Sequence, residues 1–298
     1  MRSPPTGPGS PSPADPPEPV VGAHTDDGAV PEGDTVYRLA RRLDRRLAGH
    51  TVVRSDLRHP RLATRDLAGC SVLGHVTHGK HLLTRLSGDL TLHSHLRMDG
   101  EWSVTRPGRR LPPMLMPHVR LVLTLDTKET VWGVRLHDLA LVRTSAEHEV
   151  VGHLGPDPLR DDYDPGEAVR RLYAGGDLPL VAALLDQRRL CGLGNLWVNE
   201  LAFLVGTSPW TPVRDVDVER LVHRAATMLR RSAHGPGRMQ VTTGSTRPGE
   251  EHWVSGRAGR PCRRCGTVVR VVAEIPGDAA RRRTWWCPVC QPGPPPPP

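Results

Sequence analysis

The sequence predicts an α+β protein with more than one domain. Apolar residues alternate between positions 71 and 136, recur at helical spacing between 165 and 232, and are followed by two Cys-x2-Cys pairs. A length of 298 residues suits one large domain or two ordinary ones, and a hydrophobic fraction of 37% is enough to build their cores.

The first ordered element is a helix that begins near Pro31. Its apolar positions recur at helical spacing: Val36, Leu39, Leu43 and Leu47. Asp34 is suited to the N-cap, and Gly49 stands where a glycine commonly follows the last helical turn.

Strands follow this helix. They are expected at Ser71–Thr77, His81–Leu86, Leu90–Leu96, Val119–Leu125 and Thr130–Leu136. Their alternation suits half-buried antiparallel strands, so residues 31–150 are expected to form a β-sandwich or barrel with a leading helix.

The pattern then changes. A stretch rich in Pro, Gly and Asp at 151–164 predicts a linker, and residues 165–252 predict a helical domain. The expected helices are Gly166–Tyr173, Pro179–Asp186, Leu196–Val205 and Val216–Arg231. The turn "CGLGN" at Cys191–Asn195 carries two glycines that let main-chain N–H groups approach an anion, although a plain helix connection is the commoner use of such a turn.

The two cysteine pairs give the strongest single motif. Cys262-x2-Cys265 and Cys287-x2-Cys290 are separated by 21 residues, a spacing that suits one structural Zn2+ held by a β-hairpin finger at 253–291. Two disulfides are the alternative, which the absence of a secretory signal disfavours. Cys70 and Cys191 are expected to be ordinary packed thiols.

The composition of the two ends and the distribution of charge indicate which class of protein this is. Residues 1–30 and 292–298 are Pro-rich and predict disorder. The net charge of +8 is concentrated toward the C-terminal end, which favours a polyanionic partner such as nucleic acid over a merely solvated basic surface. No apolar run is long enough for a membrane helix, and no signal peptide is visible, so we expect a soluble intracellular protein. Lys80 and Lys128 are the chain's two lysines. Arginine can supply positive charge equally well, but only the lysine amine has an accessible neutral form, so each lysine is a candidate for a chemical role.

Five blocks of sequence together resemble the formamidopyrimidine-DNA glycosylase and endonuclease VIII family of base-excision repair enzymes. They are, in order, "PEGDTVYRLARRL", "THGKHLLTRLSGDLTLHSHLRMDGEW", "HLGPDPL", "LLDQRRLCGLGNLWVNELAF" and "CRRCG…RRTWWCPVCQ". The first two blocks look more like the actinobacterial endonuclease VIII branch. The resemblance implies an N-terminal β-sandwich, a helix–two-turn–helix domain and a zinc finger, with damaged double-stranded DNA between them. It also implies a monomer in the bacterial cytoplasm, associated with the nucleoid and with no membrane contact.

The resemblance also implies the catalytic residues. Pro31 matches the family's N-terminal proline, whose secondary amine attacks the sugar C1′ of a flipped-out nucleotide, and Glu32 matches its carboxylic acid. Lys80 matches the lysine that helps at the damaged nucleoside, and Arg282 matches the arginine of the finger. Without the other blocks, Pro-Glu would be a plain helix start and Lys80 a surface side chain.

Further residues are implied to bind DNA. Gly194 and Asn195 would hold a backbone phosphate, Arg97 and Met98 would enter the gap left by the flipped nucleotide, and Arg283 would grip phosphates. Arg281 and Arg283 are rivals of Arg282 for the finger position. The alternatives are a capping role for Asn195 and core packing for Met98.

Three departures from the family pattern matter. Thr35 stands where the family often has a second acid, so the proton relay differs or a nearby histidine contributes. "GVRLHDL" replaces the cluster typical of the formamidopyrimidine branch, which favours oxidised pyrimidines as substrates. Finally, Pro31 is internal, and an amide nitrogen cannot form a Schiff base. Val30 is what an internal GTG start codon would encode, so we expect the functional chain to begin at Pro31.

Two other classes of function stay open. One is a catalytically silent DNA-binding paralogue, favoured by the blocked Pro31 and by Thr35. The other is a zinc-ribbon adaptor whose Pro-rich ends recruit partners, which leaves Pro31, Lys80 and the "GLGN" turn unexplained.

Overall fold

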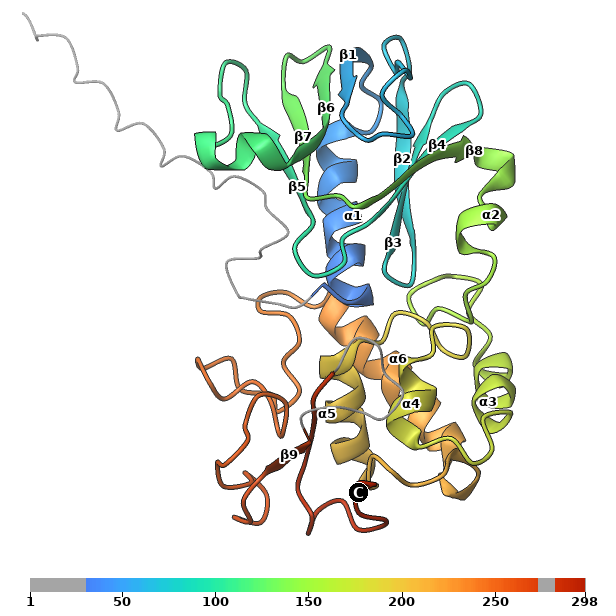
Figure 1. The fold of residues 1–298 in the computed structure, drawn as a ribbon, viewed down its shortest axis with the longest axis vertical. Coiled ribbons are helices and arrows are strands. Elements are labelled where there is room, and N and C mark those ends of the chain that lie inside the picture. Colours follow the sequence, from blue (N-terminus) through green and yellow to red (C-terminus); the bar gives the residue numbers. More distant parts are fainter. Residues whose placement is uncertain (1–30, 273–281, 298) are drawn as a thin grey trace, which may run out of the picture.

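The computed structural model describes residues 31–272 and 282–297, so the predictions for the N-terminal extension, Arg281 and Pro298 lie outside the described residues. Figure 1 shows strands at one end, helices at the other, and α1 running from between the strands toward the helical part. Among the described residues no helix combines the length and apolar character needed to cross a membrane.

The strands form two separate four-stranded antiparallel sheets rather than one closed barrel. One has the order β1-β6-β7-β5, the other β2-β3-β4-β8. Their bounds are β1 Val52–Leu57, β2 Val72–His78, β3 His81–Leu86, β4 Leu90–His95, β5 Glu101–Thr105, β6 Val119–Leu125, β7 Thr130–Val134 and β8 Asp138–Arg143. Strands β3 and β6 have their predicted bounds, whereas β1, β5 and β8 were not predicted.

Helix α1 (Gly33–Leu47) lies in the core that the two sheets share. Its buried residues Val36, Leu39, Leu43 and Leu47 pack with leucines and valines of both sheets. The predicted glycine stop is confirmed, because Gly49 adopts a φ of +85° and its N–H donates to Val72 O. The predicted N-cap is wrong: Glu32 occupies that position, while Asp34 lies within the first turn and is fully buried.

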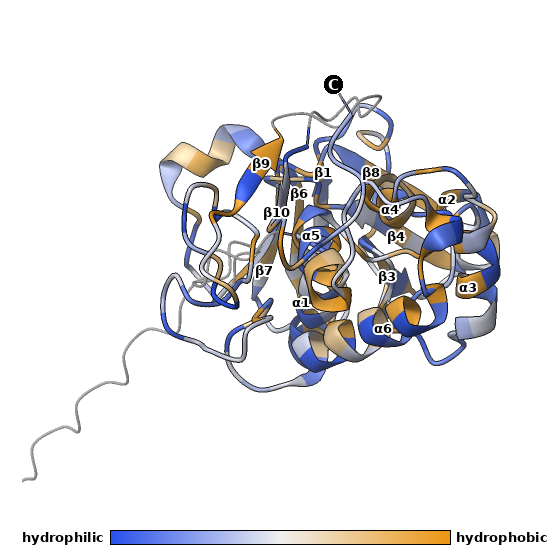
Figure 2. Cartoon of the chain, turned by 90° about the horizontal axis from the view of Figure 1, so that it is seen from below, coloured by the Kyte–Doolittle hydropathy of each residue, from blue (hydrophilic) through white to orange (hydrophobic). Residues whose placement is uncertain are grey.

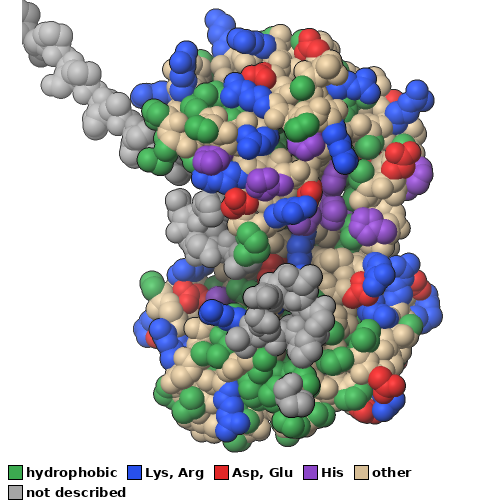
Figure 3. Space-filling view, viewed as in Figure 1, with side chains coloured by type: hydrophobic (Ala, Val, Ile, Leu, Met, Phe, Trp, Pro, Cys, Tyr) green, Lys and Arg blue, Asp and Glu red, His purple; other side chains and the backbone are tan. Residues whose placement is uncertain are grey.

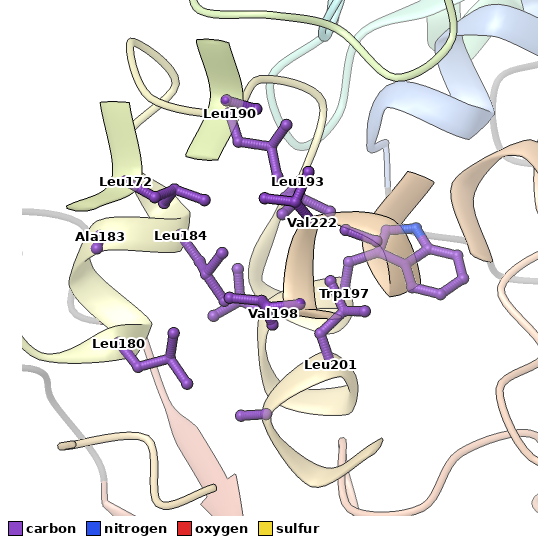
Figure 4. Close-up of a cluster of buried hydrophobic side chains, with 14 of the residues drawn as sticks. Leu172, Leu180, Ala183, Leu184, Leu190, Leu193, Trp197, Val198, Leu201 and Val222 are labelled. Atoms are coloured by element: carbon purple, nitrogen blue, oxygen red, sulfur yellow. The ribbon is translucent and has the colours of Figure 1, made fainter. Parts of the chain in front are cut away.

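Four of the five α-helices described in the second half pack around their own core; the exception is the short helix at 148–151, whose Val151 packs with Leu83. Their bounds are α2 His148–Val151, α3 Pro165–Tyr173, α4 Leu180–Leu185, α5 Asn195–Val205 and α6 Val218–His234. Figure 4 shows Trp197 and Leu201 of α5 meeting Val222 of α6 in this cluster. In Figure 2, α6 carries both apolar and polar residues, as expected of a helix with one buried face.

Residues 151–164 are held firmly between the two halves. Gly155 N donates to Gln187 O, and His78 Nε2 lies 3.1 Å from Gly155 O. Asp157 is 2% exposed and accepts a hydrogen bond from Gly79 N at 2.7 Å. This segment therefore ties the turn between β2 and β3 to the helical core.

The last described part packs against α5. Its short strands β9 (Arg270–Val272) and β10 (Thr284–Trp286) pair antiparallel. Glu200 of α5 accepts hydrogen bonds from the three consecutive N–H groups of residues 253–255, at 2.8 to 2.9 Å. Asn199 Oδ1 accepts one more from Trp285 N at 2.8 Å. These contacts fix the cysteine-bearing segment to the helical core.

Candidate functional site

The centre of the site is Glu32, buried where the first turns of α1 and α5 meet. Its carboxylate accepts hydrogen bonds from Gly194 N at 2.6 Å and from Leu196 N at 2.9 Å. Burial raises its pKa to about 7, although the charge of Lys80 acts in the opposite direction. The carboxyl group can therefore give or take a proton near neutral pH.

The glycines of the "CGLGN" turn permit this approach. Gly33 N donates to Gly192 O at 2.8 Å, and a Cβ on Gly33 would stand 2.8 Å from Gly192 Cα. A Cβ on Gly194 would stand 2.4 Å from Glu32 Cδ. The turn thus brings main-chain N–H groups to an anion, as expected, and the anion is the Glu32 carboxylate.

Lys80 lies in the turn between β2 and β3 and is largely withdrawn from solvent. Burial lowers its pKa, the negative charge of Glu32 raises it, and the positive charge of Arg282 lowers it further. Lys80, Glu32 and Arg282 thus interact through their charges, although they lie far apart in the sequence. Pro31, half-buried, directly precedes Glu32 in the same region.

A second buried acid accompanies Glu32. Asp34 Oδ2 accepts a hydrogen bond from Ser232 Oγ at 2.6 Å, burial raises its pKa, and its charge contributes to the raised pKa of Glu32. Sequence reasoning assigned this residue to a cap and treated Thr35 as a missing acid. Asp34, one position before Thr35, can act as that acid. Its place beside Glu32 depends on the contact with Ser232 of α6, almost 200 residues away, which the sequence does not show.

Asp157 is a further buried acid that the sequence did not single out. Its carboxylate accepts hydrogen bonds from Gly79 N and Leu159 N, which places it directly behind the turn that carries Lys80. Cys191, fully buried as expected, lies beside the same turn, since a Cβ on Gly79 would be 3.2 Å from Cys191 Sγ. The motif "GPDPL" was the available signal for Asp157.

The finger reaches the start of α5. Asn195 Nδ2 donates to Arg283 O at 3.0 Å, so one proton of its amide is used within the protein. The charge of Arg282 acts on Lys80, and Arg283 is exposed.

The loop after β4 projects into solvent. Met98 is 73% exposed, which excludes core packing for this side chain. Arg97 has a φ of +52° and its guanidinium holds Asp138 by two hydrogen bonds of 2.6 and 2.8 Å. Asp99 lies 3.8 Å from the His137 ring nitrogen. Arg97 therefore braces the loop from β8 and Met98 stands at its tip.

The four cysteines of the two pairs come together. Their sulfur atoms all lie within 4.8 Å of one another, with Cys265 and Cys287 at 3.5 Å and Cys262 and Cys290 at 3.9 Å. A disulfide requires about 2.05 Å, so the sulfurs are not bonded to each other. Four thiolates around one tetrahedral ion lie about 3.8 Å apart. The cluster therefore fits a single metal ion.

Comparisons with known proteins agree with this geometry. Residues 30–140 match the model of the formamidopyrimidine-DNA glycosylase N-terminal domain. A probable endonuclease 8 2 from Streptomyces coelicolor is 47% identical over 272 residues, covering 90% of this chain and 96% of the relative. A DNA-(apurinic or apyrimidinic site) lyase from Mycolicibacterium smegmatis is 42% identical over 265 residues, covering 88% and 99%.

The fold is also found among solved structures. The Lactococcus lactis enzyme in complex with DNA containing an abasic site superimposes with a TM-score of 0.73, covering 88% of this chain and all of that one at 24% sequence identity.

Proposed function

Because the chain belongs to the formamidopyrimidine-DNA glycosylase and endonuclease VIII family, and is thus a DNA glycosylase and AP lyase of base-excision repair, we propose that Pro31 is its nucleophile. The observation that carries this proposal is the meeting of Pro31, Glu32 and Lys80 at the junction of α1, α5 and the β2–β3 turn.

The reaction follows from the groups present. The Pro31 nitrogen attacks C1′ of the extruded nucleotide, and the base leaves with the electron pair of the glycosidic bond and takes up a proton. The sugar ring opens, and the nitrogen–C1′ bond becomes an iminium. Loss of a C2′ proton then expels the 3′ phosphate, and a second elimination expels the 5′ phosphate. Water finally releases the sugar fragment from Pro31.

Glu32 and Lys80 have complementary roles in this scheme. Glu32, whose pKa is about 7, donates a proton to the opening sugar and accepts one later. Lys80, held near Glu32 and Arg282, provides positive charge or a proton at the nucleoside. Asp34 serves as the second acid in place of Thr35.

In this proposal duplex DNA lies between the two halves of the protein, with the damaged nucleotide flipped out of the helix. Asn195 and Arg283 contact phosphates, whereas the N–H of Gly194 is already used by Glu32, so Gly194 acts through the shape of the turn. Met98 fills the gap, and Arg97 fixes the loop that carries Met98. Oxidised pyrimidines are the favoured substrates, since the "GVRLHDL" segment lacks the arginine cluster of the other branch.

The four cysteines hold one structural Zn2+. Sulfur separations of 3.5 and 3.9 Å suit tetrahedral coordination, which leaves no open position for chemistry. We also retain the division into a β-sandwich at 31–150, a helix–two-turn–helix domain at 165–252 and the finger at 253–291. The protein acts as a monomer in the cytoplasm, at the nucleoid.

Borohydride trapping on a duplex with an abasic site tests the nucleophile. A chain that begins at Pro31 should give a covalent adduct, because its amine is free, whereas the 298-residue chain should give none. An adduct on the longer chain would exclude Pro31 as the nucleophile. No adduct on either chain would favour a silent DNA-binding paralogue, for which the change to Thr35 is the motivating observation.

A further inference from the structure

Three histidines share one face of the sheet β2-β3-β4-β8, next to Lys80. His81 on β3 stands opposite His95 on β4, and His93 lies two residues before His95 and so faces the same side. The rings are in contact: His81 Nδ1 lies 2.8 Å from His93 Nε2, and the centroids of His81 and His95 are 4.8 Å apart. Figure 3 shows histidines gathered at the waist between the strand and helix parts.

The His81–His93 pair has a fixed number of protons to offer. Two neutral imidazoles carry two N–H groups, and one of these is used in the hydrogen bond between the rings. One outer nitrogen of the pair is then a donor and the other an acceptor. These outer atoms, His81 Nε2 and His93 Nδ1, have no hydrogen-bond partner among the described residues and are not fully buried, although His93 as a whole is only 7% exposed.

The surroundings keep the free pair uncharged. Burial and the neighbouring histidines lower the pKa of His81 to about 3, and burial and His95 lower that of His93 to about 4. Charged and titratable groups from several elements act on the three rings. His95, His153, His78 and Asp138 act on the pair itself, and Lys80 and Arg97 act on His95.

These neighbours supply little negative charge. Asp138 is the acid of this group, and Arg97 already neutralises it through two hydrogen bonds. His95 Nδ1 accepts a hydrogen bond from Arg97 N at 3.0 Å, which holds that ring in the neutral form protonated at Nε2. An anion entering here would therefore meet donors and positive charge, and the carboxylate of Asp138 is already held by Arg97.

We propose that the His81–His93 pair is a subsite for a DNA phosphodiester and takes up one proton when the phosphate binds. This rests on the proposed function, which places DNA along this face. A diester has two non-bridging oxygens that only accept hydrogen bonds, and one added proton turns both outer nitrogens of the pair into donors. The base of the extruded nucleotide plays no part in this contact.

A bound phosphate raises the low pKa of the pair, so the complex holds a proton that the free protein lacks. Affinity for DNA then increases as the pH falls from the raised pKa of the complex toward the pKa of the free pair. Above that window the pair contributes no pH dependence.

The zinc-loaded 298-residue protein and a duplex with a tetrahydrofuran abasic analogue give a binding measurement without cleavage. Fluorescence anisotropy from pH 5 to 8.5 at constant ionic strength yields the slope, and calorimetry in two buffers of different ionisation enthalpy counts the protons. We expect uptake approaching one proton at about pH 5.5 and none at about pH 8.5. Wild-type binding without proton uptake overturns the proposal, whatever the variants do.

Variants assign the proton to the pair. His93→Phe should remove the uptake and weaken binding about tenfold at low pH but less than about twofold at pH 8.5. His81→Phe should do the same, and the double variant should be no worse than either single one, because the pair acts as a unit. His223→Phe, on the exposed face of α6, is the matched control and should behave as wild type. Circular dichroism and zinc content report whether each variant is folded.

Other outcomes point elsewhere. A His93→Phe variant that keeps the wild-type slope overturns the proposal. So does a His93→Phe variant of the chain that begins at Pro31 if it loses base removal while binding the abasic analogue normally, since the pair would then read the base. Borohydride trapping is read separately on the chain that begins at Pro31. Trapping without proton uptake overturns this subsite alone, and uptake without trapping overturns the proposed nucleophile alone.

Discussion

At the scale of single residues, the site depends on the burial of its acidic side chains, which no local sequence pattern predicts. Glu32 was placed by resemblance, but its pKa of about 7 comes from burial in the tertiary structure, against which the backbone hydrogen bonds from Gly194 and Leu196 at the start of α5 act. Asp34 was misplaced as a cap because its partner Ser232 lies on α6. Residue types were predictable from the sequence, and their proton affinities were not, because desolvation is set by the tertiary structure.

The raised pKa of Glu32 predicts the shape of the pH profile. Burial keeps the carboxyl protonated up to about pH 7, so the single-turnover rate of base removal should decline at alkaline pH as the proton is lost. Glu32→Gln should be slow throughout and should instead reach a plateau at high pH, where only the Pro31 amine titrates. An unchanged alkaline decline in the variant would show that another group is responsible.

The scarcity of lysine permits a clean comparison. Lys80→Ala should lower turnover on lesion DNA by about two orders of magnitude or more, because charge and a proton donor are lost beside Glu32. Lys128→Ala, in the exposed turn between β6 and β7, is the matched control and should retain wild-type turnover. Zinc content and thermal unfolding should be unchanged in both. Equal rates for the two variants would remove Lys80 from the mechanism.

At the scale of elements, alternation along the sequence identified some strands and missed others. Strand β6 alternates between buried and half-buried positions and was predicted with its observed bounds. Strand β5 is buried at all five positions and β1 contains a bulge, so neither shows the alternation. The segment 151–164 looked like a linker because Pro, Gly and Asp also suit a loop that is pinned at several points.

The junction between α1 and α5 should not tolerate a side chain at Gly194. Gly194→Ala places a Cβ 2.4 Å from Glu32 Cδ, and overpacking of this kind costs about 1–3 kcal/mol. Gly166→Ala in the first turn of α3 meets the side-chain atoms Asp164 Oδ1 at 3.2 Å and Arg170 Nη1 at 3.5 Å, and should be neutral or slightly stabilising. Chemical denaturation measures both changes, and trapping should fail only for Gly194→Ala. A Gly194→Ala protein with normal stability and trapping would contradict this account of the turn.

Metal removal should affect the finger and spare the rest. The finger has its own small core around Phe203 and Val254, and Glu200 and Asn199 anchor it to α5 independently of the cysteines. Chelation should therefore release one zinc ion per chain and abolish tight DNA binding while the far-ultraviolet circular dichroism of the helices persists. Cys265→Ser should reproduce this state without chelator. Global unfolding on chelation would show that the helical core needs the metal.

At the scale of the whole molecule, the basic charge and the two-part architecture both favour a polyanionic partner. The formal net charge is +8, and the finger brings exposed Arg283 to the start of α5, where Asn195 Nδ2 donates a hydrogen bond to the Arg283 carbonyl oxygen. Composition predicted a polyanionic partner, but not which arginines meet it. That assignment needs the fold, because arginine pairs such as Arg97–Asp138 are already used within the protein.

Binding to duplex DNA should accordingly weaken steeply with salt. Each phosphate neutralised by the protein releases counterions and contributes about −0.9 to the slope of log K against log salt. Arg283→Ala should make that slope shallower by about one, since its exposed side chain is free of acidic partners among the described residues. Arg54→Ala, exposed on β1 and away from the finger, should leave the slope unchanged although it removes the same charge. If both variants lower the slope equally, the whole positive field attracts DNA and the finger has no special share. A change confined to Arg283→Ala instead locates the contact at the junction where the finger meets α5.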